Sequence, residues 1–221
     1  MAAILTRHWK HSPLTCSQFL SVPGKPGVVL VASETSMSNF LLHNPDCIFI
    51  HIPKTGGSTI RRGLWKSYGS PAFGHIPADW PDLFRFAFVR HPLDRFVSAY
   101  SDFTQIGYYR GSLADFAAIV TDDSILYDER RKTQAQRIRY HSIPQTHPFN
   151  CLSLAQKVYR FERFGDEIAR LAARMGLSFG ALPHRRRTQH DSWERLLDRA
   201  LRRRLVAFYE RDFAELGYPL P

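Results

Sequence analysis

The chain has 221 residues, of which 44% are hydrophobic and 23% are charged. These proportions are ordinary for a folded domain, and they exclude a collagen, a disordered tail and a multi-span membrane protein. Lysine and arginine outnumber aspartate and glutamate by 30 to 20, so the net charge is +10. Such an excess favours anionic partners: nucleic acid, an anionic membrane, a phosphorylated cofactor or an acidic polysaccharide.

The length predicts a single domain, at roughly 150 residues per domain. We expect residues 1–45 to be an irregular N-terminal extension and residues 46–221 to form the core. The three cysteines are too scattered for a zinc site or a disulfide framework. No run approaches the ~18 apolar residues of a membrane span, and the first 20 residues lack a signal-peptide pattern. A cytoplasmic location is therefore expected.

Three segments have the composition of buried strands. Residues 47–52 are continuously apolar and β-branched, which is typical of a parallel strand buried on both faces. Over 84–90, three phenylalanines fall on one face and Ala87 and Val89 on the other, and residues 157–162 form a third candidate. A shorter apolar run at 28–32 is a weaker candidate.

Helical segments alternate with these strands. Apolar residues spaced by three or four predict helices that begin near Ser58 and Leu93. Ser112 and Asp115 form a capping-box pattern before a short helix. Further helices are expected over 122–140, 166–175 and 191–216, with a loop over 144–150. Strands that alternate with helices predict an α/β domain with a largely parallel sheet.

The most informative motif, HIPKTGGST, follows the first strong strand. Its glycines, Gly56 and Gly57, allow backbone N–H groups to close around an anion. The next helix directs its positive N-terminal dipole at the same place. Ser58 and Thr59 add hydroxyl donors, and Lys54 adds a full charge. The motif predicts a phosphate cradle, but it is not a Walker A loop, because the lysine precedes the glycines.

A second motif, RHPLDRFVSAY, begins where the strand over 84–90 ends. Arg90 lies at the carboxyl end of this strand, where open α/β sheets bind ligands. Ser98 lies on the following helix, away from its apolar face. An arginine fork and a hydroxyl that converge would bind a phosphate group. Alternatively, Arg90 forms only a local salt bridge with Asp94.

Together the two motifs resemble the PAPS-dependent sulfotransferases, and specifically the carbohydrate (heparan/uronyl-type) branch. PAPS is 3′-phosphoadenosine-5′-phosphosulfate. The first motif resembles the family's 5′-phosphosulfate loop. The second resembles its 3′-phosphate motif, in which an arginine is followed eight positions later by a serine. The resemblance is clear over 46–103, and it implies a three-layer sandwich with a central, mostly parallel sheet, the P-loop-like sulfotransferase fold.

The resemblance also implies a role for each matching residue. Lys54 would contact the phosphosulfate and stabilise negative charge on the leaving oxygen, and Arg90 and Ser98 would hold the 3′-phosphate. The 5′-phosphate would be held by Thr55, Gly56, Gly57, Ser58 and Thr59. Arg186 and Thr188 would also contact the cofactor, although the family often has an Asn/Ser pattern at that place.

Sulfuryl transfer needs a base to accept the proton of the attacking hydroxyl, and histidine suits this role. His75 follows a glycine between the two motifs, where some relatives that act on uronic acids carry the base. His75 is therefore the expected catalytic base. His141 and His147 are alternatives, and His51 is expected to be structural. Residues 58–74 contain no Asp or Glu, which disfavours the carboxylate base of other family members.

The implied reaction transfers a sulfuryl group from PAPS to a hydroxyl group and leaves PAP. The acceptor is expected to be a carbohydrate, which the positive charge would allow to be acidic. No metal, nucleic acid or membrane span is expected, and a Golgi lumen location would apply only to a trimmed ectodomain.

The alternatives are a nucleotide kinase, which would need Mg²⁺ ligands, a non-catalytic module that binds nucleic acid or another polyanion, and a sulfotransferase that binds PAPS without turnover. Residues 1–45 and 104–150 have no clear role, although residues 132–140 could line an acceptor groove.

Overall fold

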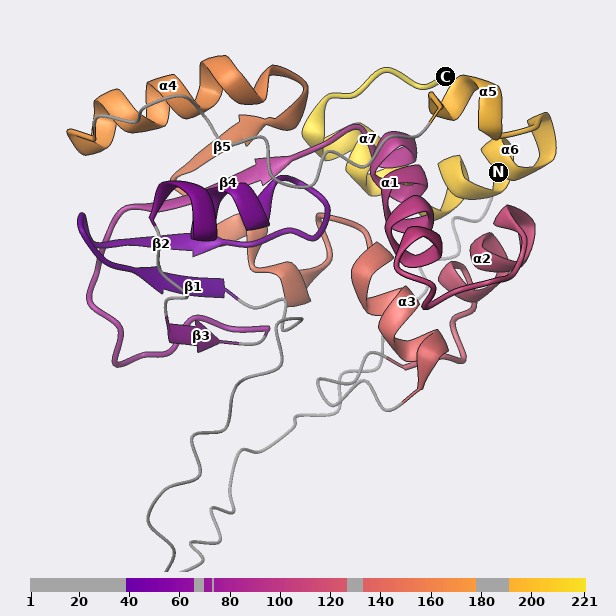
Figure 1. Cartoon of the computed structure of the whole chain (residues 1–221), viewed down its shortest axis with the longest axis horizontal. Coiled ribbons are helices and arrows are strands. Elements are labelled where there is room, and N and C mark those ends of the chain that lie inside the picture. Colours follow the sequence, from indigo (N-terminus) through magenta and orange to yellow (C-terminus); the bar gives the residue numbers. More distant parts are fainter. Residues whose placement is uncertain (1–38, 66–69, 73, 127–132, 178–190) are drawn as a thin grey trace, which may run out of the picture. The chain divides into compact units, whose positions relative to one another are not determined.

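The computed structural model of the chain describes residues 39–65, 70–72, 74–126, 133–177 and 191–221. The strand candidate at 28–32 lies outside them. The described residues form a five-stranded sheet in the order β3-β1-β2-β4-β5 (Figure 1). The strands are β1 (Asn39–Leu42), β2 (Cys47–Ile50), β3 (Ser70–Ala72), β4 (Arg85–Val89) and β5 (Lys157–Arg160).

The centre of the sheet is parallel, and one side is antiparallel. β2 pairs in parallel with β4, and β4 with β5, whereas β1 runs antiparallel to both β2 and β3. The three strongest strand predictions are confirmed, each to within two residues at either end. β1 and β3 were not predicted, and β1 lies inside the segment that we expected to be irregular. Both are short, so their pairing partners rather than their own composition make them strands.

The described helices are η1 (Thr59–Leu64), α1 (Pro92–Gln105), α2 (Leu113–Val120), α3 (Gln134–Ser142), α4 (Phe164–Met175), α5 (Trp193–Leu196), α6 (Arg199–Phe208) and α7 (Glu210–Leu216). Short 3₁₀ turns occur at η2 (Pro148–Asn150), η3 (Leu152–Leu154) and η4 (Phe161–Arg163). η1 is a π-helix rather than the regular helix expected after Ser58. The helix expected over 122–140 is wrong at its start, because residues 122–126 form turns. The segment expected to be helical over 191–216 contains three separate helices.

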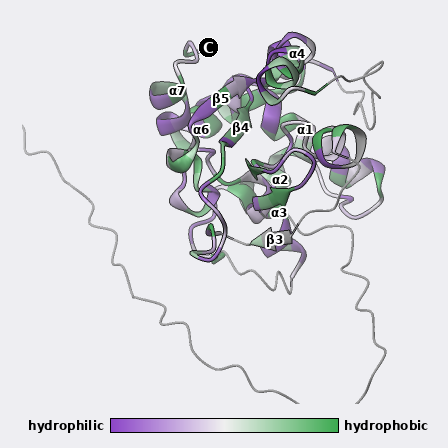
Figure 2. Cartoon of the chain, turned by 90° about the vertical axis from the view of Figure 1, so that its left-hand side faces the viewer, coloured by the Kyte–Doolittle hydropathy of each residue, from purple (hydrophilic) through white to green (hydrophobic). Residues whose placement is uncertain are grey.

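Both faces of the sheet are covered by apolar side chains. On one face Phe86 and Phe88 pack with residues of η1 and α4, including Ile60 and Leu171. The opposite face is covered by the segment that follows β3 and by residues near η3. α4 runs beside β5 and carries both hydrophobic and hydrophilic residues (Figures 1 and 2). This layered arrangement confirms the predicted α/β fold.

α1 carries the chain from the end of β4 into a second apolar core. Phe96 and Phe103 of α1 pack there with Phe116 of α2 and with side chains of α3, α6 and α7. Arg95 is fully buried among them. Its guanidinium donates to the last carbonyls of α3, those of His141, Ser142 and Ile143. A cation at the C-terminus of a helix is favourable, so α3 provides the compensation that this burial requires.

No helix in the described part of the chain is long and apolar enough to cross a membrane.

Candidate active site

The loop after β2 has a backbone that few side chains tolerate. Lys54 and Gly56 both adopt left-handed conformations, with φ of 67° and 90°. A Cβ atom on Gly56 would lie 2.6 Å from the ring of Phe164. The Thr55 hydroxyl donates to the carbonyl of Ile52 at 2.8 Å and is buried within the loop. The loop is therefore held in one tight conformation, in which the Thr55 hydroxyl serves the loop itself.

The side chain of His51 packs against this loop. Its ring is buried between Phe40 and Phe49, at 5.7 and 5.3 Å between centroids. It also lies so close to Gly57 that a Cβ atom there would overlap it. Burial, with a smaller effect from the Arg61 guanidinium, lowers the pKa of His51 to about 3. The imidazole is neutral at physiological pH, which agrees with the structural role expected for it.

Lys54 connects the loop to α1 and to the second motif. Its ammonium nitrogen lies 3.2 Å from Oδ2 of Asp102 on α1. Its carbonyl oxygen accepts a hydrogen bond from Nη1 of Arg90 at 3.4 Å. The two sequence motifs, 36 residues apart, are therefore in direct contact. The ion pair between Lys54 and Asp102 was not predicted from the sequence.

Arg90 is fixed at both its side chain and its backbone. Nε and Nη2 donate to one oxygen of Asp94 at 2.9 and 2.7 Å, and the guanidinium lies 4.7 Å from the ring centroid of Phe161. The local salt bridge offered as an alternative thus exists, but Arg90 also reaches the Lys54 loop. The Arg90 backbone N–H and carbonyl are both bonded to the side-chain amide of Gln145, at 2.9 and 2.8 Å.

Gln145 is held in turn by a buried carboxylate that the sequence analysis missed. Asp212 of α7 is fully buried and accepts hydrogen bonds from the backbone N–H groups of Gln145 and Thr146, at 2.8 and 2.9 Å. It also accepts from the side chains of both residues, at 3.3 and 2.9 Å. The partners are 66 to 67 positions apart, so no local sequence pattern could have revealed them.

The serine and threonine residues of the two motifs differ in how deeply they are buried. Ser98 is buried on α1, one turn from both Asp94 and Asp102, which pair with Arg90 and Lys54. Thr59 is buried at the start of η1, and Ser58, just before it, is partly exposed. The sequence-predicted loop residues, Arg90 and Ser98 thus surround the junction between the end of β2, the end of β4 and α1.

His75 is exposed, and its backbone is tied to the same region. Its carbonyl oxygen accepts a hydrogen bond from the Asn39 side chain at 3.0 Å. The other end of the Asn39 amide accepts from the backbone N–H of His51 at 3.3 Å. Asn39 is buried on β1, so it was missed together with that strand. It joins the segment carrying His75 to the beginning of the Lys54 loop.

The other candidate histidines are engaged in local structure. Nδ1 of His141 lies 2.8 Å from the carbonyl of Arg137, and its ring packs against Phe103. Nδ1 of His147 accepts from the backbone N–H of Phe149 at 3.2 Å, and burial lowers the pKa of His147. Arg186 and Thr188 lie outside the described residues.

The chain was compared with known proteins. The search of curated proteins found no match. Among solved structures, a sulfotransferase from Alicyclobacillus acidocaldarius is similar, with 22% identity and a TM-score of 0.41. The similarity covers 62% of this chain and 54% of that one, so the chain spans about half the length of that structure. The sequence pattern of the sulfotransferase family matches residues 40–219. That range includes both motifs and every described helix and strand except the first residue of β1, and the chain therefore belongs to the sulfotransferase family.

Proposed function

We propose that this protein transfers a sulfuryl group from PAPS to a hydroxyl group of a carbohydrate by in-line displacement. The observation that carries the proposal is the contact between the Lys54 carbonyl and the Arg90 guanidinium. It brings together a loop suited to one phosphate and an arginine suited to another. Donor nucleotides of this class carry phosphate groups at both the 5′ and 3′ positions, so two adjacent sites fit them.

The loop fits the 5′ end of such a donor. Gly56 and Gly57 lie where a Cβ atom would strike the rings of Phe164 and His51, so the loop backbone packs closely on these rings. The backbone N–H groups at the start of η1 can donate hydrogen bonds to an anion. Ser58 and Thr59 would add hydroxyl donors, whereas Thr55 would contribute its backbone N–H, because its hydroxyl is buried and bonded to the Ile52 carbonyl. Lys54 would place its ammonium where charge develops on the leaving oxygen, which is the most effective form of electrostatic catalysis.

Arg90 and Ser98 fit the 3′ end. The guanidinium has five donors in a planar fork, so it can hold the Asp94 carboxylate and a phosphate group together. Its position is fixed by Gln145, which reduces the entropy lost on binding. When bound, PAPS supplies the activated sulfuryl group, and the protein supplies the cations, the orientation and the base. Arg186 and Thr188 remain proposed cofactor contacts.

His75 is the proposed base. Its ring is exposed, so an acceptor can reach it, and Asn39 fixes its backbone. Within hydrogen-bond reach of the acceptor, a neutral imidazole would take the hydroxyl proton as the oxygen attacks sulfur. His141 is buried and His147 is partly buried, so an acceptor would reach their rings less readily.

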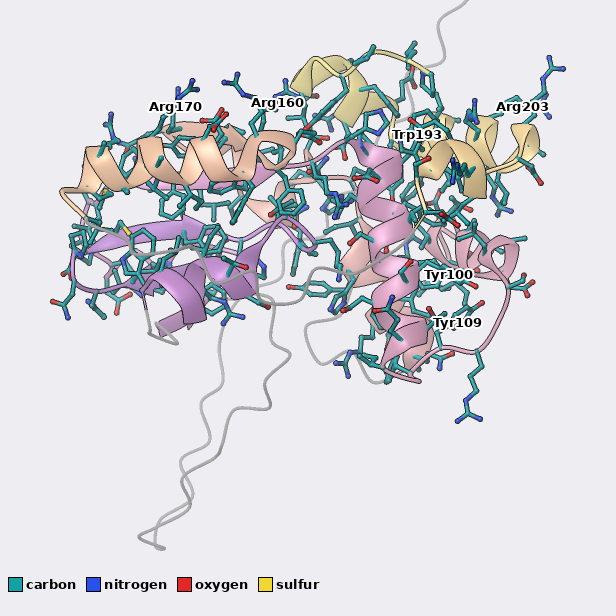
Figure 3. All side chains as sticks on the ribbon, turned by 45° about the horizontal axis from the view of Figure 1, so that its top comes forward. Tyr100, Tyr109, Arg160, Arg170, Trp193 and Arg203 are labelled. Atoms are coloured by element: carbon teal, nitrogen blue, oxygen red, sulfur yellow. The ribbon has the colours of Figure 1, made fainter. Side chains whose placement is uncertain are left out.

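The proposed carbohydrate acceptor is compatible with a negative charge. Arg199, Arg202 and Arg203 of α6 also line an open cavity of about 580 Å³ with Val206 and Pro221; it adds to the positive surface, but its lining shares no residue with the proposed donor site, and the acceptor is not assigned to it. Arg203 is exposed, and its place on α6 is labelled in Figure 3. We also propose a reducing, cytoplasmic location, which the free buried thiols of Cys47 and Cys151 support.

The donor site is tested by calorimetric titration with PAP, the desulfated product, without metal. Wild type should bind PAP, and Lys54→Ala should bind it roughly 10- to 100-fold more weakly, since a charged hydrogen bond is lost. Lys157→Ala removes an exposed lysine on β5 and serves as the control for net charge. Binding of ATP with Mg²⁺ in place of PAP would instead support a nucleotide kinase. Binding of neither would leave the basic surface as the main indication of function.

The base is tested with labelled PAPS and an acceptor found by screening glycans. His75→Asn should keep PAP affinity and lose roughly 10²- to 10⁴-fold in transfer rate. His43→Asn is the control, because His43 is an exposed histidine paired with Asp46 in the turn between β1 and β2. Full activity of His75→Asn would place the base elsewhere.

A further inference from the structure

Both cations of the proposed donor site are paired with carboxylates of the same helix. Asp94 binds Arg90, and Asp102, two turns further along α1, binds Lys54. The four side chains are between 10% and 29% exposed. The positive charges offered to the nucleotide are thus partly balanced by α1 before any nucleotide arrives.

The two pairs differ in how they would respond to a phosphate group. Arg90 is a rigid fork with several donors, and it can keep Asp94 while it accepts a second anion. Lys54 is a compact point charge, and its ammonium is directed at Asp102 across 3.2 Å. A phosphate or sulfate oxygen brought to this ammonium would also come close to the Asp102 carboxylate, and like charges in a poorly hydrated site repel strongly.

We propose that Asp102 is an internal counter-ion of Lys54 that competes with the donor nucleotide for the ammonium group. The inference rests on the proposed function, because it assigns Lys54 to the donor. In the free protein Asp102 holds the Lys54 side chain against α1. When the nucleotide binds, the ammonium exchanges the carboxylate for a donor oxygen. When it leaves, the ammonium returns to Asp102, which lowers the affinity for the product PAP and speeds its release.

The test is PAP binding to Asp102→Asn, which keeps the shape of the side chain and removes its charge. We expect the dissociation constant to fall about 3- to 10-fold relative to wild type, mainly through slower PAP dissociation in stopped-flow experiments. Asp82→Asn is the matched control: it makes the same change in net charge at a carboxylate that is 88% exposed and paired with Arg85. Its PAP affinity should stay within about twofold of wild type.

Other outcomes overturn the inference. Weaker PAP binding by Asp102→Asn would show that Asp102 supports the binding site rather than competing for Lys54. Unchanged affinity would show that the pair has no effect on the nucleotide. Asp102→Ser also removes the charge, so it repeats the test with a second side chain in case Asp102→Asn fails to fold. Thermal unfolding of both variants shows whether each is folded. Failure of the wild type to bind PAP would overturn the proposed function itself. Normal wild-type binding that Lys54→Ala weakens and Asp102→Asn leaves unchanged would overturn only the role of Asp102.

Discussion

Three features of the fold meet at Lys54. Its backbone is left-handed, its carbonyl accepts from Arg90 and its ammonium pairs with Asp102. A left-handed conformation costs a residue other than glycine about 1 to 2 kcal/mol, so the neighbouring contacts must maintain it. Strained backbone conformations are common at functional sites, where one side chain must have a defined position. Here the strained residue directs its ammonium from the end of β2 to α1.

The buried His51 predicts a loss of stability in mild acid. Its pKa is about 3 in the folded protein and about 6.5 in the unfolded chain. Between these values the unfolded state binds a proton that the folded state does not, so the free energy of unfolding falls as the pH falls. From pH 7 to pH 5 the loss attributable to His51 is about 2 kcal/mol.

Urea denaturation at the two pH values measures this effect. Burial also lowers the pKa of His91 and His147, so the comparison is between the pH dependence of wild type and that of His51→Gln or His51→Phe. In either variant, the fall in the free energy of unfolding from pH 7 to pH 5 should be about 2 kcal/mol smaller than in wild type. An equal difference in wild type and both variants would contradict a neutral, buried His51.

At the scale of single elements, the helix ends follow local rules. Ser112 caps α2 by accepting from the backbone N–H of Asp115, whose carboxylate accepts from Ser112 in return. The sequence predicted this capping box, because all of its members lie within four residues. α4 and α7 both end at a glycine in the left-handed conformation, Gly176 and Gly217, which is a common way for a helix to end.

Ser112→Ala should therefore destabilise the protein by about 1 kcal/mol, the usual cost of losing a helix cap. Chemical denaturation measures the change, and PAP titration should show unchanged affinity, since α2 contributes no residue to the proposed site. Ser153→Ala, at an exposed serine in η3, is the control and should be neutral. A marked loss of PAP affinity in Ser112→Ala would mean that α2 affects the site.

At the scale of the whole molecule, the C-terminal helix supports the proposed donor site. Asp212 on α7 holds Gln145, and Gln145 holds the backbone of Arg90 at the end of β4. His91, the next residue, stacks on Trp193 of α5 at 5.2 Å between ring centroids. Parts of the chain more than 100 residues apart thus fix the backbone of Arg90, the proposed phosphate-binding arginine.

Asp212→Ala should destabilise the protein by about 3 to 5 kcal/mol, because buried donors of Gln145 and Thr146 would lose their acceptor. Surviving folded protein should bind PAP more weakly, since Arg90 would lose its fixed position. Asp212→Asn keeps one acceptor oxygen, so its stability and its PAP affinity should lie between those of wild type and of Asp212→Ala. Glu215→Ala, on the exposed side of the same helix, should change stability by no more than about 0.5 kcal/mol. Equal stability of Asp212→Ala and Glu215→Ala would contradict this supporting role.

The sequence by itself determined the parts of this protein that depend on neighbours along the chain. The parallel strands β2, β4 and β5, the caps of α2, α4 and α7, and the order of the two motifs all follow from spacing and composition over a few residues. The α/β class follows from their alternation. The match to the family over residues 40–219 agrees with the resemblance found in those motifs.

Only the tertiary structure decided which distant side chains meet. β1 is too short to be predicted, so Asn39 and its bonds to His51 and His75 could not be seen. Asp102 and Asp212 are ordinary acidic residues of helices until folding places them against Lys54 and Gln145. Ion pairs and buried hydrogen bonds depend on distance in space, and separation along the chain carries almost no information about it.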